Sequence, residues 1–374
     1  MMNGTSAKDP FAGFRVVAKR RESETITSFE LAPPDEAQAP GFVPGQFLVV
    51  RLPTGNGHGP ILRNYSISSS PHDSSRLRIT VKREPPPADR ADLPPGEGSN
   101  YLHEQVDVGD VIHVNGPRGD FQLDPDSTRP VVLLSGGVGL TPLVSMLHSL
   151  ATVGDRRVYF IHACDSGRVH ALKDEVLELA ARRPGISTHF CYRFPTDEDI
   201  ASAGFHSRGM ISREVLQSIL PLDDYDIYMC GPPAFMQANY RLLRGLGVPK
   251  ERIRYEFFGP ATVLDPDDVE PAVTQTEPSP SVQGEALQEE GVRVVFRKSG
   301  KTAVWDEKAK SLLDFAESLG IDAPFSCRAG VCSTCLSTLV RGEVEYFEEP
   351  LSEPGPGEVL LCCSRPKTTV EVDV

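Results

Sequence analysis

The chain has 374 residues and a formal net charge of −14, with 39% hydrophobic and 24% charged residues. These values are ordinary for a globular protein of two or three domains, and the negative charge argues against nucleic acid as a partner. No apolar run approaches the ~20 residues that span a bilayer, and the first residues lack a secretion signal, so we expect no membrane partner and a cytoplasmic location.

Residues 10–125 contain short strand-like runs, such as "QFLVVRL" and "RLRITVKRE", separated by Pro and Gly clusters. This pattern predicts an antiparallel β-barrel, with a β-sandwich as the alternative. The run "LRNYSISSSP" carries Arg63, Tyr65 and Ser66. An arginine can hold a phosphate, a tyrosine offers a flat face and a serine can bond a polar ring edge, which together suit a flavin. An ordinary polar strand is the alternative.

Between residues 128 and 263, apolar runs alternate with helical patterns, which predicts an α/β domain with a parallel sheet. The first run, "PVVLLSGG", meets a glycine-rich turn, and a helix then opens. Glycines let the backbone approach a pyrophosphate, and a helix N-terminus favours its negative charge. The same glycines would also suit a plain tight turn. The candidate residues for NAD(P)H binding are Gly136, Gly137, Gly139 and Thr141.

A later run, "YMCGPPAFM", places Cys230 and Gly231 at the carboxyl end of another strand, where ligands gather in open α/β sheets. Cys230 could equally be buried core. After the second strand, Asp165 can bind a ribose 2′-OH and repel a 2′-phosphate, which favours NADH. Arg168 could do the opposite, so NADPH remains open.

Residues 264–290 separate this domain from the rest of the chain. The wider stretch 261–290 holds eight acidic residues and no basic ones, is rich in Pro, Ser and Gln, and has no apolar periodicity. This composition predicts an acidic, flexible linker over 264–290.

Residues 291–374 begin with a predicted hairpin and a short helix, and then crowd three cysteines into "SCRAGVCSTC". The spacing Cys327-x4-Cys332-x2-Cys335, with a later thiol at Cys362 or Cys363, is the ligand pattern of plant-type [2Fe–2S] clusters. A zinc site is the alternative, but structural zinc favours two C-x2–4-C pairs, and the second pair is missing.

The cysteine segments resemble plant-type ferredoxins. "SCRAGVCSTC" is similar to the cluster loop of that family, and "EVLLCCSRP" is similar to the later segment that carries the fourth ligand. The resemblance implies a β-grasp fold with a one-electron carrier. It also selects Cys362 as the fourth ligand and makes Cys363 its neighbour and alternative.

Residues 12–264 resemble the ferredoxin–NADP reductase superfamily, because R-x-Y-S, G-G-x-G-x-T-P and C-G-P-P occur in this order. The segments "ITVKRE" and "YEFFGP" are closest to the reductase part of flavohaemoglobins, whereas the domain order resembles phthalate dioxygenase reductase. The first likeness implies FAD, and the second allows FMN. The resemblance implies that Arg63 and Ser99, beside Gly98, bind the flavin phosphates and that Tyr65 and Ser66 contact the flavin ring. It also implies that Cys230 lies near the nicotinamide and that Glu256 and Phe258 lie near the flavin.

The resemblances together imply a multi-domain electron-transfer enzyme. NAD(P)H would give a hydride to the flavin, and single electrons would pass through the [2Fe–2S] cluster to a protein acceptor. We expect a separate oxygenase, with a Rieske-type one favoured, and no side-chain acid, base or nucleophile of the usual kind. A reductase for another metalloprotein, such as a hybrid-cluster protein, and a redox-sensing module without turnover are the alternatives. No globin domain is present, so nitric-oxide dioxygenase activity is not expected.

Overall fold

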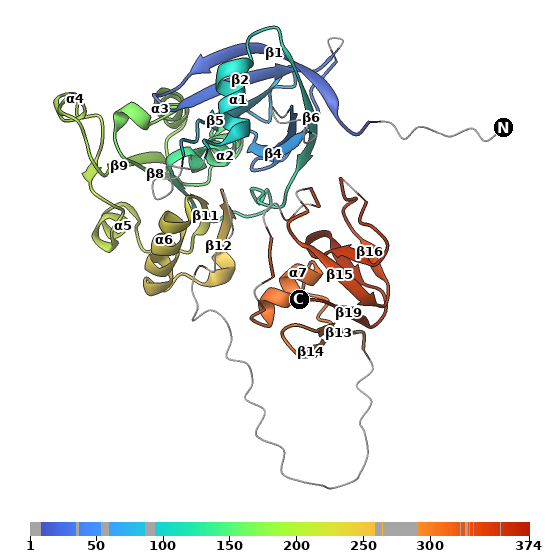
Figure 1. Cartoon of the computed structure of the whole chain (residues 1–374). Coiled ribbons are helices and arrows are strands. Elements are labelled where there is room, and N and C mark those ends of the chain that lie inside the picture. Colours follow the sequence, from blue (N-terminus) through green and yellow to red (C-terminus); the bar gives the residue numbers. More distant parts are fainter. Residues whose placement is uncertain are drawn as a thin grey trace. The chain divides into compact units, whose positions relative to one another are not determined.

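The computed structural model divides the chain into two compact units, Met1–Leu264 and Asp265–Val374, and each is described by itself (Figure 1). The predicted linker lies almost wholly outside the described part of the chain. The described residues are 9–34, 37–53, 60–86, 94–258, 264, 291–321, 323–325, 328, 330–331, 333–351 and 353–374.

The first unit begins with a six-stranded antiparallel sheet in the order β4-β3-β6-β1-β2-β5, as predicted. An isolated bridge between Ile67 and Ile79 joins the end of β4 to β5 and closes the sheet toward a barrel. Alternate side chains of the strands, such as Phe29 and Leu48, fill its interior. The strands are β1 (Ala12–Arg21), β2 (Ile26–Ala32), β3 (Phe47–Leu52), β4 (Ile61–Ser66), β5 (Leu77–Lys82) and β6 (Val111–Arg118).

One helix of this domain, α1 (Glu97–Gln105), was not predicted from the sequence. It is only nine residues long, follows a Pro- and Gly-rich loop, and buries only Gly98, Ser99 and Leu102. A segment this short shows too few turns for its apolar spacing to stand out.

The second half of the first unit is the predicted parallel sheet, with six strands in the order β10-β9-β8-β7-β11-β12. The chain runs outward from β7 in one direction and then returns to add β11 and β12 on its other side. This reversal between β7 and β11 is a topological switch point, where open α/β sheets bind ligands. The strands are β7 (Val131–Gly136), β8 (Val158–Cys164), β9 (Ile186–Tyr192), β10 (Ser207–Arg208), β11 (Asp226–Gly231) and β12 (Ile253–Phe257).

Helices cover both faces of this sheet (Figure 1). Successive β7 side chains point to opposite faces, so Val131 and Leu133 pack with α2 and α3, while Val132 and Leu134 pack with α5 and α6. The helices are α2 (Leu140–Thr152), α3 (Lys173–Ala181), α4 (Asp197–Ala201), α5 (Arg213–Ile219) and α6 (Pro233–Gly245), with 3-10 turns η2 (Gly137–Gly139), η3 (Gly167–Val169) and η4 (Lys250–Arg252).

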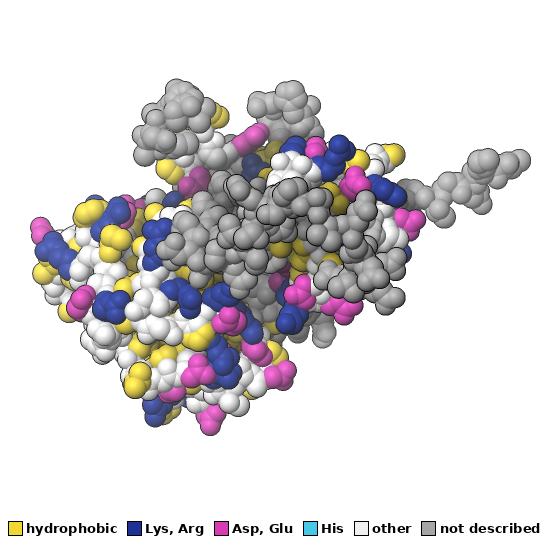
Figure 2. Space-filling view, turned by 90° about the horizontal axis from the view of Figure 1, so that it is seen from below, with side chains coloured by type: hydrophobic (Ala, Val, Ile, Leu, Met, Phe, Trp, Pro, Cys, Tyr) yellow, Lys and Arg dark blue, Asp and Glu magenta, His cyan; other side chains and the backbone are white. Residues whose placement is uncertain are grey.

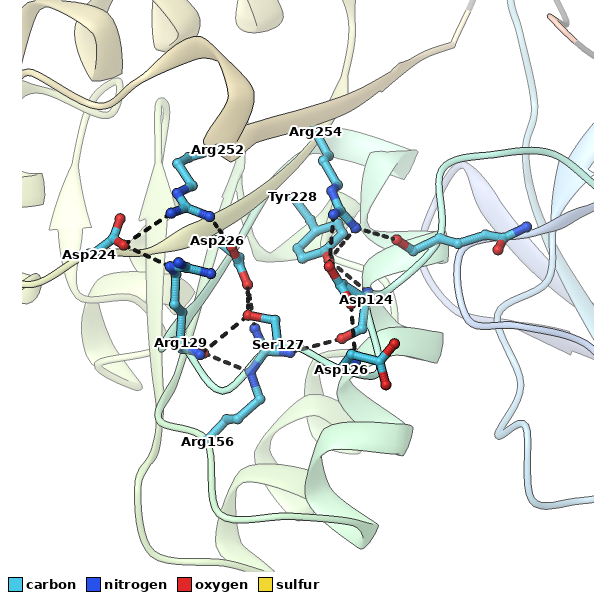
Figure 3. Close-up of polar contacts among 11 residues, drawn as sticks. Asp124, Asp126, Ser127, Arg129, Arg156, Asp224, Asp226, Tyr228, Arg252 and Arg254 are labelled. Carbon is cyan, nitrogen blue, oxygen red and sulfur yellow. Dashed lines mark hydrogen bonds and ion pairs between the residues drawn. The ribbon is translucent and has the colours of Figure 1, made fainter. Parts of the chain in front are cut away.

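A polar network holds the amino ends of β7, β11 and β12 (Figure 3). Asp226 accepts hydrogen bonds from Ser127 and, at 2.7 Å, from Arg156. Arg254 donates to Asp124 at 2.9 Å. Asp124 and Ser127 belong to the segment that leads from the barrel into β7. The network therefore fastens the connection between the two domains at the sheet edge opposite the glycine-rich turn.

A buried ion pair joins the barrel to the nucleotide domain. Arg78 of β5 donates two hydrogen bonds, of 2.7 and 2.8 Å, to Glu175 of α3, and His148 of α2 lies 2.6 Å from the same carboxylate. Burial opposes ionisation of Glu175, but the hydrogen bonds from His148 and Arg78 outweigh it and lower its pKa to about 2. The Glu175 carboxylate is therefore charged at neutral pH.

Replacing Glu175 with Gln is expected to lower the free energy of unfolding by about 3–5 kcal/mol at pH 7, since the Arg78 charge is left buried without its partner. The folded-state pKa lies below the ordinary 4.5, so this stabilisation is present above pH 4.5 and is lost as the pH falls toward 2. Unfolding curves of wild type and E175Q should converge over that range. The exposed Glu178 on the same helix supplies a control, and an E178Q loss as large as that of E175Q would contradict the prediction.

The second unit contains a mixed five-stranded sheet in the order β14-β13-β19-β15-β17 and a two-stranded sheet of β16 and β18. β13 pairs antiparallel with β14 and parallel with β19. Ser311 caps α7 by accepting the Asp314 N–H at 3.1 Å. The elements are β13 (Arg293–Phe296), β14 (Lys301–Val304), α7 (Leu312–Ser318), β15 (Leu336–Arg341), β16 (Val344–Tyr346), β17 (Glu358–Leu360), the turn η6 (Leu361–Cys363), β18 (Ser364–Pro366) and β19 (Val370–Val372).

Two further observations concern a membrane and charged molecules as possible partners. Among the helices of the described residues, none has the length and apolarity needed to cross a bilayer. On the face that Figure 2 shows, Lys and Arg side chains are interspersed with Asp and Glu, as expected for a chain with 38 basic and 52 acidic residues.

Candidate functional site

Three strand ends meet at the switch point of the parallel sheet. In the register of the sheet, Cys230 of β11 lies opposite Ser135 of β7 on one side and Glu256 of β12 on the other. The next positions bring together Gly136, Gly231 and Phe257 at the same edge. The sequence-predicted Gly136, Cys230 and Gly231 are thus neighbours in space.

The glycine-rich turn packs directly against Cys230. A Cβ added at Gly139 would lie 2.3 Å from the Cys230 carbonyl oxygen, so only glycine fits there. Gly137 has a φ of +54° and faces open space. No side chain caps α2, which opens after this turn. An open backbone turn followed by an uncapped helix N-terminus suits the pyrophosphate of a dinucleotide.

Thr141 lies in the first turn of α2, directly after the glycine-rich turn. Its hydroxyl donates a hydrogen bond to the Val138 carbonyl at 3.1 Å, and the residue is buried. The side chain therefore supports the glycine-rich turn at the start of α2.

Ser66 and Glu256 bring the barrel and the nucleotide domain together. Ser66 ends β4, is buried, and donates a hydrogen bond to Oε2 of Glu256 at 3.4 Å across 190 residues of sequence. Burial raises the pKa of Glu256 to about 8, against a smaller opposing effect of the Ser66 hydrogen bond. Burial, with Glu256 nearby, also raises the pKa of the Cys230 thiol well above its usual range. These three groups therefore remain uncharged at neutral pH.

A candidate anion site lies nearer the other end of β4, at Arg63. Arg63 is exposed, and a Cβ added at Gly98 would lie 3.0 Å from its Cγ, so the first turn of α1 packs closely against this arginine. No side chain caps α1. A guanidinium beside an uncapped helix N-terminus suits a flavin phosphate. The Ser99 hydroxyl is already engaged, since it donates to the Gly96 carbonyl and accepts the Glu84 N–H, each at 3.1 Å.

Two aromatic residues flank these groups. Tyr65 precedes Ser66 on β4 and is partly buried, and burial raises the pKa of its hydroxyl above the ordinary value. Phe258 follows β12, is also partly buried, and packs against the core cluster formed with α2 and α3. The Ser66–Glu256 hydrogen bond connects β4 to β12, with Tyr65 next to Ser66 and Phe258 two residues after Glu256, which makes this junction the candidate flavin-ring site.

The ferredoxin-like unit buries two of the predicted iron ligands, Cys335 and Cys362. The Gly330 N–H donates to the Cys362 Sγ at 3.3 Å. The Cys363 thiol donates to the Leu360 carbonyl at 3.8 Å, although it also lies beside Gly330, where an added Cβ would be 2.9 Å from its Sγ. Backbone N–H groups aimed at thiolate sulfurs are what an anionic cluster requires. The other two predicted ligands, Cys327 and Cys332, lie outside the described residues.

Arg328 is a supporting residue that sequence reasoning missed. It lies in the cysteine loop with a φ of +51°, and its guanidinium donates to Asp314 at 3.0 Å and also binds Glu317, both on α7. These bonds anchor the loop to the helix. An arginine within the cysteine motif, and two acidic residues three apart on the preceding helix, are the only signals in the sequence.

Three family models match successive parts of the chain. Residues 13–123 match the oxidoreductase FAD-binding domain, residues 133–240 the oxidoreductase NAD-binding domain, and residues 295–367 the 2Fe-2S iron-sulfur cluster binding domain. These matches support FAD, a nicotinamide nucleotide and a [2Fe–2S] cluster as the cofactors.

Several known proteins are similar to this chain. A flavohemoprotein of Bacillus cereus (strain ATCC 10987) is 42% identical over 255 residues, which are 68% of this chain and 62% of that protein. The flavohem-like FAD/NAD binding domain of nitric oxide dioxygenase from Vibrio cholerae is 36% identical with a TM-score of 0.59, over 67% of this chain and 99% of that domain. Phthalate dioxygenase reductase is 23% identical with a TM-score of 0.55, over 98% of this chain and 100% of that structure.

The extent of these matches limits which properties of the relatives can be assigned to this chain. The chain spans about three fifths of the length of the flavohemoproteins, namely 62%. The likeness to phthalate dioxygenase reductase, at 23% identity, shows a shared fold over almost the whole chain.

Proposed function

The chain belongs to the flavohemoprotein-like family of FAD- and NAD-binding oxidoreductases, extended by a 2Fe-2S domain, and from this premise we propose that it feeds electrons from NADH to a partner oxygenase of the Rieske type. The observation that carries the first half of the proposal is the Ser66–Glu256 hydrogen bond, which joins the candidate flavin and nucleotide sites. The boundaries 10–125, 128–263, 264–290 and 291–374 are proposed for the domains and linker.

The proposed site holds its cofactors with residues from both domains. Arg63 and the N-terminus of α1 would hold the flavin phosphates, while Gly137 and the N-terminus of α2 would hold those of the dinucleotide. Bound FAD and the iron–sulfur cluster supply hydride acceptance and one-electron transfer, respectively. Cys335 and Cys362, with Cys327 and Cys332, are the proposed iron ligands.

The chain's own groups would orient the nicotinamide and the flavin ring. Cys230 and Gly231 end β11, and they lie close to the glycine-rich turn because Gly139 of that turn has no side chain. Ser66 and the protonated Glu256 present hydrogen-bonding groups without a net charge. A close, water-poor contact between the two rings favours direct transfer over loss to solvent.

The acceptor proposal rests on domain order. Phthalate dioxygenase reductase shares the fold over 98% of this chain, including the iron–sulfur domain at the C-terminal side. The same order here supports an oxygenase component as the electron acceptor. A reductase serving a hybrid-cluster protein, or a redox sensor without turnover, would use the same cofactors and differs in its partner.

The test is NADH oxidation by the reconstituted full chain. We expect slow oxidation without an acceptor, at least tenfold faster oxidation with an artificial one-electron acceptor, and further electron delivery to a purified Rieske-type oxygenase. Bleaching by NADH without any acceptor reduction would favour the redox sensor. Delivery to a hybrid-cluster protein but not to the oxygenase would favour the alternative reductase.

The position of Asp165 indicates a preference for NADH over NADPH. Its carboxylate pairs with Arg193 at 3.0 Å, and both side chains are exposed just beyond β8 and β9. In wild type the carboxylate would repel a 2′-phosphate and neutralise Arg193. We expect kcat/KM to favour NADH over NADPH at least tenfold, and D165N to narrow that preference about tenfold because Arg193 is freed. D174N, at an exposed position on α3, is the control, and equal rates for both nucleotides in wild type would refute the prediction.

A further inference from the structure

A second cluster of metal-binding side chains lies at the carboxyl end of β8, next to the proposed nucleotide site. One ring nitrogen each of His162 and His170 and the Sγ of Cys164 all lie within 4.8 Å of one another. His162 and Cys164 are two residues apart on a strand, so their side chains share one face. His170 comes from the turn before α3, and its ring centroid lies 4.4 Å from that of His162.

Both histidines bury a nitrogen that has no partner among the described residues. His162 is 0% exposed and His170 is 4% exposed, and Nε2 of each ring lacks a hydrogen bond. An unpaired polar atom in the interior costs about 1–3 kcal/mol, so two adjacent ones call for a ligand. Burial also lowers the pKa of both rings, which keeps them neutral and able to bind a cation.

The opposite nitrogens of the two rings are already held. Nδ1 of His162 lies 2.8 Å from the Ser135 hydroxyl, and Nδ1 of His170 lies 2.8 Å from the Tyr192 hydroxyl. A metal-binding histidine commonly donates the N–H of its second ring nitrogen to an oxygen acceptor. This hydrogen bond fixes the ring and leaves the lone pair of the first ring nitrogen free for the metal. The supporting contacts of a metal site are therefore in place.

We propose that His162, His170 and Cys164 form a binding site for a thiophilic d10 cation, Zn²⁺ being the representative ion. Two neutral imidazoles and one thiolate are a ligand set that zinc accepts, with a fourth position left for water. Zinc–ligand bonds of about 2.0–2.3 Å place ligand atoms roughly 3.3–3.7 Å apart, so the three ligand atoms, now within 4.8 Å of one another, would draw together on binding.

Cys164 also provides the route of entry. It is partly exposed, whereas both histidines are buried, and its thiol currently donates to the Ser166 carbonyl at 3.4 Å. Binding would break this hydrogen bond, release the thiol proton to solvent and form the metal–sulfur bond. The ion would then tie both ends of the 164–170 turn, which carries Asp165 and Arg168, and thereby stiffen a segment near the proposed nucleotide site.

The test counts zinc in the full chain loaded with FAD and iron, after incubation with Zn²⁺ and removal of weakly bound metal with a mild chelator. We expect about one zinc per chain in wild type and at least a tenfold loss of zinc affinity in C164A and in H162Q. C191A is the matched control, because Cys191 is a buried cysteine of the neighbouring β9 outside the cluster. Flavin and iron contents report whether each variant folds.

X-ray absorption at the zinc edge of the wild type keeps the test decisive if the variants do not fold. Two nitrogen ligands and one sulfur ligand would support the site. Less than a tenth of a zinc per chain, zinc retained equally by C164A, or an environment of sulfur alone would overturn the proposal. These outcomes do not depend on NADH turnover, so they are separate from a failure of the proposed function.

Discussion

Replacing Ser66 with Ala is expected to slow reduction of the bound flavin by NADH about 100-fold. The Ser66 hydroxyl is buried at the end of β4 and is the barrel group that bonds Glu256 of the nucleotide domain. Removing one preorganised donor from a water-poor site typically costs about 10²–10³ in rate. Stopped-flow absorbance in the absence of an acceptor measures this step directly, and FAD content should be unchanged.

Ser68 provides the control for this experiment. It is also fully buried, follows the same strand, and loses the same atom on substitution, but its hydroxyl bonds Thr80 at 2.8 Å and lies outside the proposed site. S68A should reduce flavin within about twofold of wild type while lowering stability by about 1–3 kcal/mol. Equal slowing in S66A and S68A would mean that the hydroxyl of Ser66 has only a structural role.

Glu256 should reveal its unusual environment through the pH dependence of stability. Its folded-state pKa of about 8 lies above the ordinary 4.5, so the folded protein holds a proton that the unfolded chain releases. Stability from this group is complete below pH 4.5 and is lost as the pH rises toward 8. The free energy of unfolding of wild type should fall relative to that of E256Q over this range, by at most about 1.4 kcal/mol per pH unit. Parallel curves would show that Glu256 ionises normally.

The parallel sheet could be predicted from sequence because its strands are continuous apolar runs between long helical patterns. "PVVLLSGG" became β7 and η2, and "YMCGPP" became β11 and the turn before α6. Burial on both faces of a parallel sheet produces such runs directly. The antiparallel barrel was predictable for a similar reason, whereas α1 was too short to show a helical period.

The chemistry of the site was less predictable, because it depends on contacts between distant residues. Nothing in "RYEFFGP" distinguishes Glu256 from the acidic residues of the surface, and only a family resemblance singled it out. Its raised pKa comes from burial, and its hydrogen bond to Ser66 spans 190 residues. Thr141, which the motif assigned to the nucleotide site, donates its hydroxyl to the Val138 carbonyl, a contact that the motif alone did not reveal.

Replacing Cys362 with Ser is expected to abolish the [2Fe–2S] cluster, while C363S should retain it. The Gly330 N–H of the cysteine loop points at the Cys362 Sγ, whereas the Cys363 thiol donates to Leu360. Four thiolates hold a cluster of this type, so the loss of one removes the ligand set. Iron content and the electron paramagnetic resonance signal after reduction measure the cluster.

The same pair of variants separates the two units of the chain. Residues Met1–Leu264 form a compact unit without any of the cysteine loop, so C362S should still bind FAD and accept a hydride from NADH at the wild-type rate. Electron delivery to a protein acceptor should fall at least 100-fold, because the cluster is the proposed relay. If C363S instead lost the cluster and C362S kept it, the ligand assignment would be reversed. If C362S lost the cluster and delivery were unchanged, electrons would leave the flavin without passing through this domain.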